Sequence, residues 1–163
     1  MSAQSLPRRN PLATRGFTII EVAMAATILV VGVMGMIRAI TIGSEMMATA
    51  RRQTLAAQII NHELEAFRFS SWATISGLST GVTTLTINDQ FNSAITAVGL
   101  TKGTTLTLSR TVANVADLTN VREITLTVTW TMRPSGASVV RTYRRMGSSY
   151  FGQYGLNQTY QRT

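Results

Sequence analysis

The sequence predicts an α+β protein in which a long N-terminal helix precedes a small antiparallel β-sheet, and three observations support this fold class. An apolar stretch over residues 17–37 is long enough to cross a bilayer as a helix. Residues 38–70 contain no proline and repeat apolar side chains at helical spacing. From residue 71 onward Thr, Ser, Gly and Val dominate, and apolar residues alternate with polar ones as in half-buried strands.

The composition excludes several kinds of site. The 163-residue chain has no cysteine, which rules out disulfides, thiolate metal sites and cysteine nucleophiles. It has one histidine, His62, and seven acidic residues, of which Glu63 and Glu65 come closest to a carboxylate pair. We expect His62, on the polar face of the helix, to be solvated or to cap the headpiece, and both glutamates to be surface charges. The sequence therefore predicts no enzyme, no metal site and no cofactor.

Positive charge is the other compositional feature. Fourteen arginines and one lysine against seven acidic residues give a net charge of +8. This balance is compatible with nucleic-acid binding, with contact to anionic lipid, or with solubility alone.

The N-terminus changes character abruptly at residue 17. Residues 1–16 are polar and contain three arginines, whereas residues 17–37 carry a single charge, Glu21. A secretory signal peptide would have a shorter apolar core, followed by a small-residue cleavage site. A plain anchor fits the length but does not explain Glu21. A buried core helix would not be expected to begin beside a basic leader.

Glu21 is the informative residue of the apolar stretch. A carboxylate inside a spanning helix costs about 2.5–3.5 kcal/mol on insertion scales, and such residues usually have a partner and a function. Its place near the helix start would also let it snorkel to the interface without any role. The functional interpretation is favoured by the surrounding sequence, which reads RGFTIIEV over residues 15–22.

The motif Gly16-Phe17-Thr18-x-x-Glu21, followed by about twenty apolar residues, resembles the prepilin signature of type IV pilins and type II secretion pseudopilins. The resemblance implies that a membrane aspartyl peptidase cuts between Gly16 and Phe17 and N-methylates the new amino terminus at Phe17. It also implies that Glu21 is an assembly contact, pairing with the Phe17 amine of a neighbouring subunit. Each charge is costly alone in lipid, so the pair would set axial stagger as well as affinity.

The resemblance implies an organisation for the whole chain, in the type IV pilin-like fold with the helix packed on the sheet. Residues 1–16 would be a leader that the peptidase removes. Residues 17–37 would be the membrane-spanning half of the helix, and 38–70 its amphipathic half. A β-sheet headpiece would follow over 71–146. Residues 147–163 would form a Tyr-, Gly- and Gln-rich tail, which we expect to be disordered rather than packed as an extension.

Alternation predicts the strands of the headpiece, which are residues 83–88, 104–112 and 121–132. A turn signal follows at residues 133–136, and 139–146 is expected to be the returning strand. The hairpin over 121–146 resembles that of the minor pilins called pilus modification proteins and of the shorter minor pseudopilins.

Two departures from major pilins favour a minor subunit. The membrane half of the expected helix contains no proline, and the absence of cysteine forbids a C-terminal disulfide loop. The prediction is a minor type IV pilin or pseudopilin that helps to initiate, prime or decorate a filament. Its expected partners are the prepilin peptidase, other pilins, the inner-membrane assembly platform and the lipid bilayer. Its expected location is the inner membrane with the headpiece in the periplasm, and then the filament.

The expected hairpin also suggests a second function. After Glu123 the chain has five arginines and no acidic residue, and Arg141, Tyr143 and Arg145 would share one face of the returning strand. Together with Arg144 they form a set suited to phosphate contact and base stacking. A charged strand edge that prevents aggregation is the alternative. A DNA-binding minor pilin of a DNA-uptake filament is therefore the second hypothesis, although without its leader the chain retains twelve basic and seven acidic residues.

Overall fold

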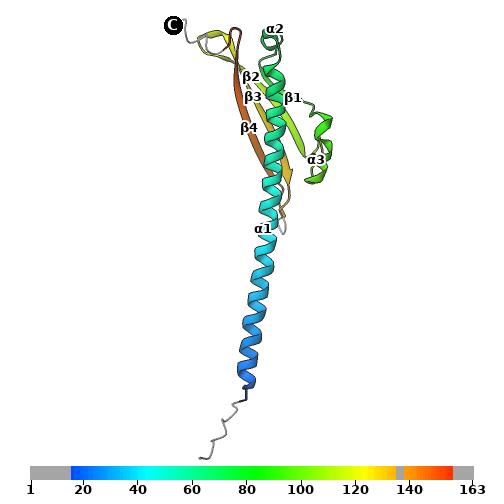
Figure 1. The fold of residues 1–163 in the computed structure, drawn as a ribbon, viewed down its shortest axis with the longest axis vertical. Helices are drawn as coiled ribbons and strands as arrows, with labels where there is room; N and C mark the ends of the chain where they lie inside the picture. Colours follow the sequence, from blue (N-terminus) through cyan, green and yellow to red (C-terminus); the bar gives the residue numbers. More distant parts are fainter. Residues whose placement is uncertain (1–15, 135–137, 156–163) are drawn as a thin grey trace, which may run out of the picture. The chain divides into compact units, whose positions relative to one another are not determined.

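Two compact units make up the chain in the computed structural model, which describes residues 16–134 and 138–155. The units are Met1–Ile42 and Gly43–Thr163. Helix α1 (Ile19–Arg68) belongs to both units (Figure 1). Its residues up to Ile42 lie in the first unit, and its residues from Gly43 onward form the first element of the second.

The part of α1 in the first unit is apolar and exposed on all sides. Every described residue up to Ile42 is exposed. Two threonine hydroxyls in this part are satisfied within the helix, because Thr27 donates to the Ala23 carbonyl at 2.9 Å and Thr41 to the Ile37 carbonyl at 3.0 Å. A helix that is apolar all round belongs in an apolar environment rather than in water.

The second unit contains a four-stranded antiparallel sheet whose strand order follows chain order, β1-β2-β3-β4. The strands are β1 (Gly81–Leu85), β2 (Leu106–Val115), β3 (Leu118–Met132) and β4 (Arg141–Gly152) (Figure 1). Sequential antiparallel pairing of this kind is expected when short alternating segments are joined by turns. In the tight turn between β2 and β3, Asp117 has φ 62°, a left-handed conformation that Asp adopts more readily than most residues.

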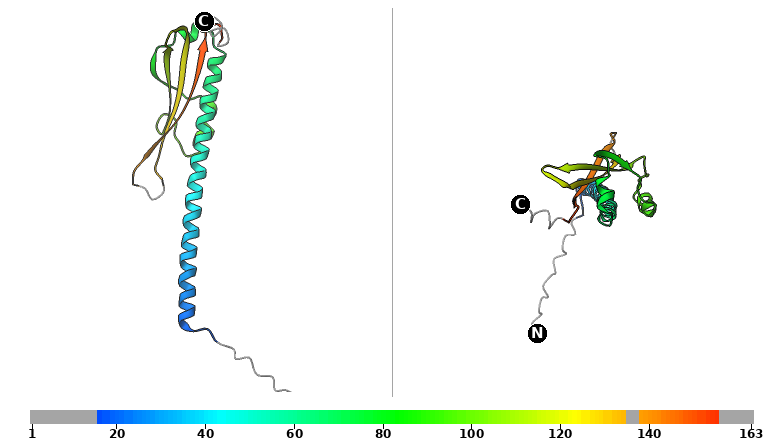
Figure 2. Two further views of the ribbon diagram at one scale, coloured as in Figure 1. Left: turned by 90° about the vertical axis from the view of Figure 1, so that its left-hand side faces the viewer. Right: turned by 90° about the horizontal axis from the view of Figure 1, so that it is seen from above.

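One face of α1 packs on the sheet within the second unit (Figure 2). The buried residues of α1 follow one another at spacings of one, three or four positions, as on one face of a helix, and are Leu55, Ala56, Ile59, Ile60 and Leu64. Alternate residues of β2 and β3 meet them from the sheet, namely Leu106, Leu108, Ile124, Leu126, Val128 and Trp130. All members of the core cluster lie in the second unit, so its packing does not depend on the first.

Three short helical segments within residues 71–146 were not expected from the sequence. They are α2 (Trp72–Ser76), η1 (Asp89–Phe91) and α3 (Asn92–Ala97). The first two begin at polar caps, because the Ser71 hydroxyl accepts the Thr74 N–H and the Asn88 side chain accepts the Gln90 N–H. α2 and α3 each bury one isoleucine in the core.

The outer face of the sheet is rich in threonine. Thr125, Thr127 and Thr129 alternate with the buried residues of β3. Across to β2, Thr129 lies beside Thr107 and Thr125 beside Thr111. These residues combine the branched Cβ that suits a pleated surface with a hydroxyl that water can reach.

The expected α+β layout is confirmed, with differences at the element ends. α1 covers Ile19–Arg68 where 17–70 was expected. The largest difference is in the returning strand, which was expected at 139–146 and is β4, Arg141–Gly152. The expectation of a disordered tail is therefore wrong for residues 147–152, which pair with β3 and bury Phe151. Residues 156–163 of that tail lie outside the described residues.

Candidate functional site

Among the described residues, α1 is the one helix long and apolar enough to cross a membrane. The most apolar 18-residue window of this helix has a mean hydropathy of 2.2, and none of that window is buried. Its exposed apolar part exceeds the length of about 20 residues that a bilayer requires. Length and composition thus make the first unit the candidate membrane segment.

Gly16, Phe17 and Glu21 lie at the N-terminal end of α1. Gly16 and Phe17 precede the helix, and Phe17 is 83% exposed. A Cβ added to Gly16 would meet no atom within 4 Å, so the glycine is not required by packing within this chain. The expected cleavage junction is therefore accessible non-helical chain.

Thr18 separates this junction from the helix. Its hydroxyl accepts the Glu21 N–H at 3.3 Å, which is the N-cap hydrogen bond of a capping box. Thr18 was not among the predicted site residues, although the spacing Thr18-x-x-Glu21 is a recognised sequence signal for such a cap. As an acidic residue in the first turn, Glu21 is also stabilised by the helix dipole, an effect within the chain that is separate from the expected intersubunit contact.

The four basic and aromatic residues expected at a nucleic-acid contact all lie on β4, but on two faces. Arg141, Tyr143 and Arg145 alternate along the strand and share one face, as predicted, whereas Arg144 lies on the other. Tyr143 is half-buried and stacks on Trp130, with ring centroids 5.8 Å apart and planes at 10°. One face of the Tyr143 ring is therefore covered by protein and closed to a stacked base.

His62 is half-buried and contacts Gln90 and Phe91 of η1, which agrees with the second of the two expectations, a histidine that caps the headpiece. The Gln90 amide nitrogen lies 3.1 and 3.2 Å from the two ring nitrogens, and the Phe91 ring meets the imidazole edge-on at 5.5 Å. Glu65 is exposed and pairs with Arg68 at 2.6 Å, as expected for a surface charge. In the part of the chain that the structure describes, no three His, Cys, Asp or Glu side chains gather as a metal site would require.

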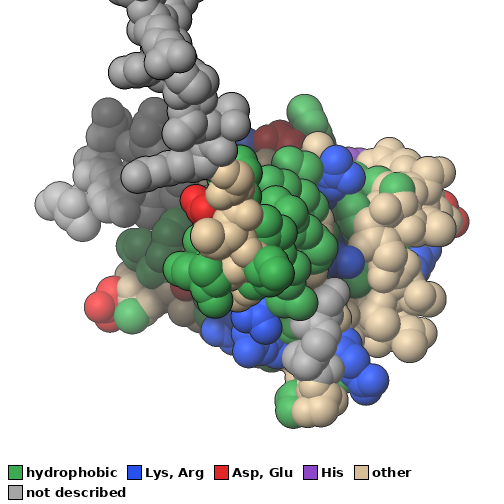
Figure 3. Space-filling view, turned by 90° about the horizontal axis from the view of Figure 1, so that it is seen from below, with side chains coloured by type: hydrophobic (Ala, Val, Ile, Leu, Met, Phe, Trp, Pro, Cys, Tyr) green, Lys and Arg blue, Asp and Glu red, His purple; other side chains and the backbone are tan. Residues whose placement is uncertain are grey.

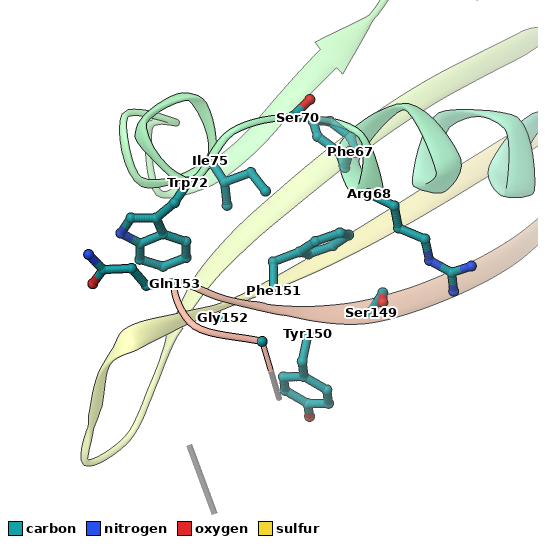
Figure 4. A pocket seen from close by; sticks show the side chains of 11 residues that line it. Phe67, Arg68, Ser70, Trp72, Ile75, Ser149, Tyr150, Phe151, Gly152 and Gln153 are labelled. Carbon is teal, nitrogen blue, oxygen red and sulfur yellow. The ribbon is translucent and has the colours of Figure 1, made fainter. Parts of the chain in front are cut away.

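A cavity of about 400 Å³ lies in the second unit, between the end of α1, α2 and the end of β4 (Figure 4). Phe67 and Phe151 meet in its wall with their rings edge to face, 6.3 Å apart. Its ionisable lining residues are Arg68 and Tyr150. This lining offers no carboxylate or imidazole for acid–base chemistry.

No family model matches this chain, and comparison with curated proteins and with solved structures gave no significant match. A functional assignment therefore depends on the N-terminal motif and on the elements found within each unit.

Proposed function

We propose that this protein is a minor type IV pilin or pseudopilin, a filament subunit that helps to initiate, prime or decorate a type IV pilus or a type II secretion pseudopilus. The observation that carries the proposal is the position of Gly16, Phe17 and Glu21 at the junction between a basic leader and an exposed apolar helix. A long helix on a four-stranded antiparallel sheet is compatible with a pilin-like fold.

The junction geometry suits peptidase processing. Proteases bind their substrates as extended chain, and the chain at Gly16 and Phe17 is not helical. The helix begins only after Thr18, which caps it. Cleavage at Gly16 would thus remove the basic leader without unwinding a turn of α1, and Phe17 would acquire the new amine.

Assembly then follows from the apolar helix. In a bilayer the exposed side chains of the first unit contact lipid, and in a filament they would contact the same part of neighbouring subunits. Glu21 and the Phe17 amine would each be stabilised there by the opposite charge of a neighbour. The core of the second unit can remain folded throughout, because it contains no residue of the first.

Capture of DNA is the second hypothesis, and the geometry favours it less. The arginines of β4 are divided between two faces, and Tyr143 is engaged by Trp130. Stacking platforms for single strands need exposed aromatic faces beside the cations.

Co-expression with a prepilin peptidase tests the proposal. The intact mass of the product should correspond to a chain beginning at N-methylated Phe17, shortened by the sixteen leader residues. Gly16→Val should block the cut, because a branched side chain would crowd the peptidase site. Ala13→Val is the matched control, since it adds a branched side chain to the leader three residues before Gly16, and it should be processed normally. A wild-type chain that keeps Met1 or Ser2 in those cells would contradict the proposal.

A further inference from the structure

We propose that the end of the second unit formed by the β3–β4 hairpin and the first turns of its α1 segment binds the surface of an anionic bilayer, with arginine side chains contacting phospholipid headgroups. This inference rests on the membrane anchoring in the proposed function, but it concerns a different surface. We call this surface the basic end, and its arginines are Arg51, Arg52, Arg133, Arg141, Arg144 and Arg145.

Charge is distributed unevenly along the hairpin. Glu123 lies near the start of β3, opposite Tyr150 in the register. The hairpin arginines lie toward the other end, where Met132 pairs with Arg141. The nine residues between Glu123 and Met132 correspond to about 30 Å of strand, so the acidic group is remote from the arginines.

Arginines of α1 belong to the same end. The Arg52 Nη1 atom lies 3.2 Å from the Met132 sulfur, and its Nε donates to the Val98 carbonyl at 3.0 Å. Arg51 is adjacent and exposed. Between Gly43 and Arg52, Glu45 is the one acidic residue of the helix. Among the described residues, the arginines of the basic end therefore outnumber its acidic residue, and Figure 3 shows Lys and Arg atoms at several places in the view from below.

Two contacts show which way the hairpin runs. Gly147 of β4 lies against Ile60, whereas Arg141 is the register partner of Met132, which touches Arg52. Strand β4 therefore runs from Arg141, at the level of Arg52, to Gly147, at the level of Ile60. Its Arg141 end is the one nearer to Gly43, where the α1 segment of the second unit begins. Val139 and Val140, which directly precede Arg141 in the chain, are called the tip.

The tip carries exposed apolar side chains beside these cations. Val139 is 68% and Val140 49% exposed. Branched apolar residues next to arginines are typical of surfaces that enter the boundary between headgroups and acyl chains.

Chain continuity identifies the bilayer as the occupant. Ile42, the last residue of the first unit, is bonded to Gly43. Arg52 lies nine residues further on, about 14 Å of helix at 1.5 Å per residue. In the proposed function the first unit crosses the bilayer, so Arg51 and Arg52 are the first arginines of the second unit to follow it in the chain. Anionic headgroups attract cations that come within about a Debye length, 8–10 Å, of the surface.

The chain has no cysteine, which allows the inference to be tested with single labels on the full-length protein. Val140→Cys reports the tip, Met34→Cys the membrane segment, and Thr119→Cys the opposite end of β3. Each variant would carry an environment-sensitive fluorophore and be reconstituted in nanodiscs that contain a quencher at the headgroup boundary. The discs would consist of phosphatidylcholine alone or of phosphatidylcholine mixed with phosphatidylglycerol.

We expect the label at position 140 to be quenched several-fold more in the anionic discs, and salt to reverse this. The label at 119 should stay unquenched in both, and the label at 34 should be shielded from water in both. Replacing Arg133, Arg141 and Arg145 by glutamine should abolish the quenching at 140, whereas Arg68→Gln, which alters an exposed arginine on another part of α1, should not.

Three results would overturn the inference. An unquenched label at 140 with a shielded label at 34 would refute the docking and leave membrane anchoring intact. Equal quenching at 140 in neutral and anionic discs would refute headgroup recognition. A label at 34 that remains in water would refute the anchoring, and the docking with it.

Discussion

Gly147 of β4 lies directly against Ile60 of α1, so closely that a Cβ on the glycine would come within 2.7 Å of the Ile60 Cγ2 atom. Carbon atoms that are not bonded to each other do not approach so far without displacement. A side chain at position 147 would thus have to push the helix away from the strand. Glycine is required here for close approach rather than for backbone freedom.

Gly147→Ala is therefore expected to destabilise the second unit by about 1–3 kcal/mol, the usual cost of overpacking a core. Chemical denaturation followed by circular dichroism measures this as a lower midpoint. Ser148→Ala is the matched control, because Ser148 is the exposed neighbour on the same strand, and its midpoint should barely move.

The same contact predicts a coupling. Ile60→Ala removes the atom that Gly147→Ala would meet, and it should be destabilising by itself because Ile60 is buried. In that background, Gly147→Ala should cost less than it does alone. Strictly additive effects would show that the helix and the strand do not meet as described.

The proposed assembly role of Glu21 differs from the capping role that the spacing Thr18-x-x-Glu21 allows, and two substitutions separate them. Glu21→Gln retains the capping-box pattern but removes the charge, whereas Glu21→Ala removes both. If the charge acts in assembly, both variants should be cleaved normally after Gly16. Incorporation into filaments should fall about tenfold or more in both, which corresponds to a loss of about 1.4 kcal/mol or more in the free energy of assembly. The measurement is the amount of the subunit in sheared filaments relative to membranes. Incorporation of Glu21→Gln at the wild-type ratio would assign Glu21 to the cap alone.

The stacked pair of Trp130 and Tyr143 should contribute to stability through its rings rather than through the tyrosine hydroxyl. Tyr143→Phe keeps the stack and should leave the unfolding midpoint nearly unchanged. Tyr143→Leu loses it and should cost about 0.5–1.5 kcal/mol beyond the change in buried area. Near-ultraviolet circular dichroism, which responds to the asymmetric surroundings of Trp130, provides an independent readout. An equal loss in both variants would argue against the stacked geometry.

The ion pair between Lys102 and Asp89 predicts a dependence of stability on pH. The hydrogen bond from Lys102, followed by one from Asn92, lowers the pKa of Asp89 below its ordinary value. Because the folded-state pKa is the lower one, the stabilisation is present above the ordinary aspartate pKa of about 3.9 and is lost as pH falls through the folded value. The effect should be small, since Asp89 is exposed.

Lys102→Gln should accordingly have a slightly lower unfolding midpoint than wild type at neutral pH, and the difference should vanish in strong acid. Asp117→Asn is the matched control, because asparagine tolerates the left-handed conformation at that turn and Asp117 is also exposed. A difference between Lys102→Gln and wild type that persists at the lowest pH would contradict the attribution to the carboxylate.

The elements predicted best from the sequence are those whose pattern is long. The apolar stretch and the helical repeat after it specify α1, and strict alternation specifies β3. The end of β4 lacked such a pattern, since Gly147, Ser148 and Ser149 look like a loop. They form a strand because β3 offers an unpaired edge and because Gly147 fits beneath the helix, and both are properties of the tertiary structure.

The candidate site divides in the same way. Gly16, Phe17 and Glu21 were identified by a short contiguous motif, and such a motif is visible in one sequence. The shared face of Arg141, Tyr143 and Arg145 also followed from alternation. The covering of Tyr143 by Trp130 and the proximity of Arg52 to Met132 did not, because they join positions far apart in the chain.

The threonines on the outer face of the sheet have a consequence for how the second unit stays dispersed in water. Threonine and valine are nearly isosteric and both favour strands, so Thr125, Thr127 and Thr129 promote sheet formation to much the same degree as three valines would. The two residue types differ in how strongly their side chains bind water. The threonine hydroxyls hold a hydration layer that valine would not, and we expect this layer to keep a broad pleated surface from adhering to its own copies. One residue type thus serves both secondary structure and colloidal stability.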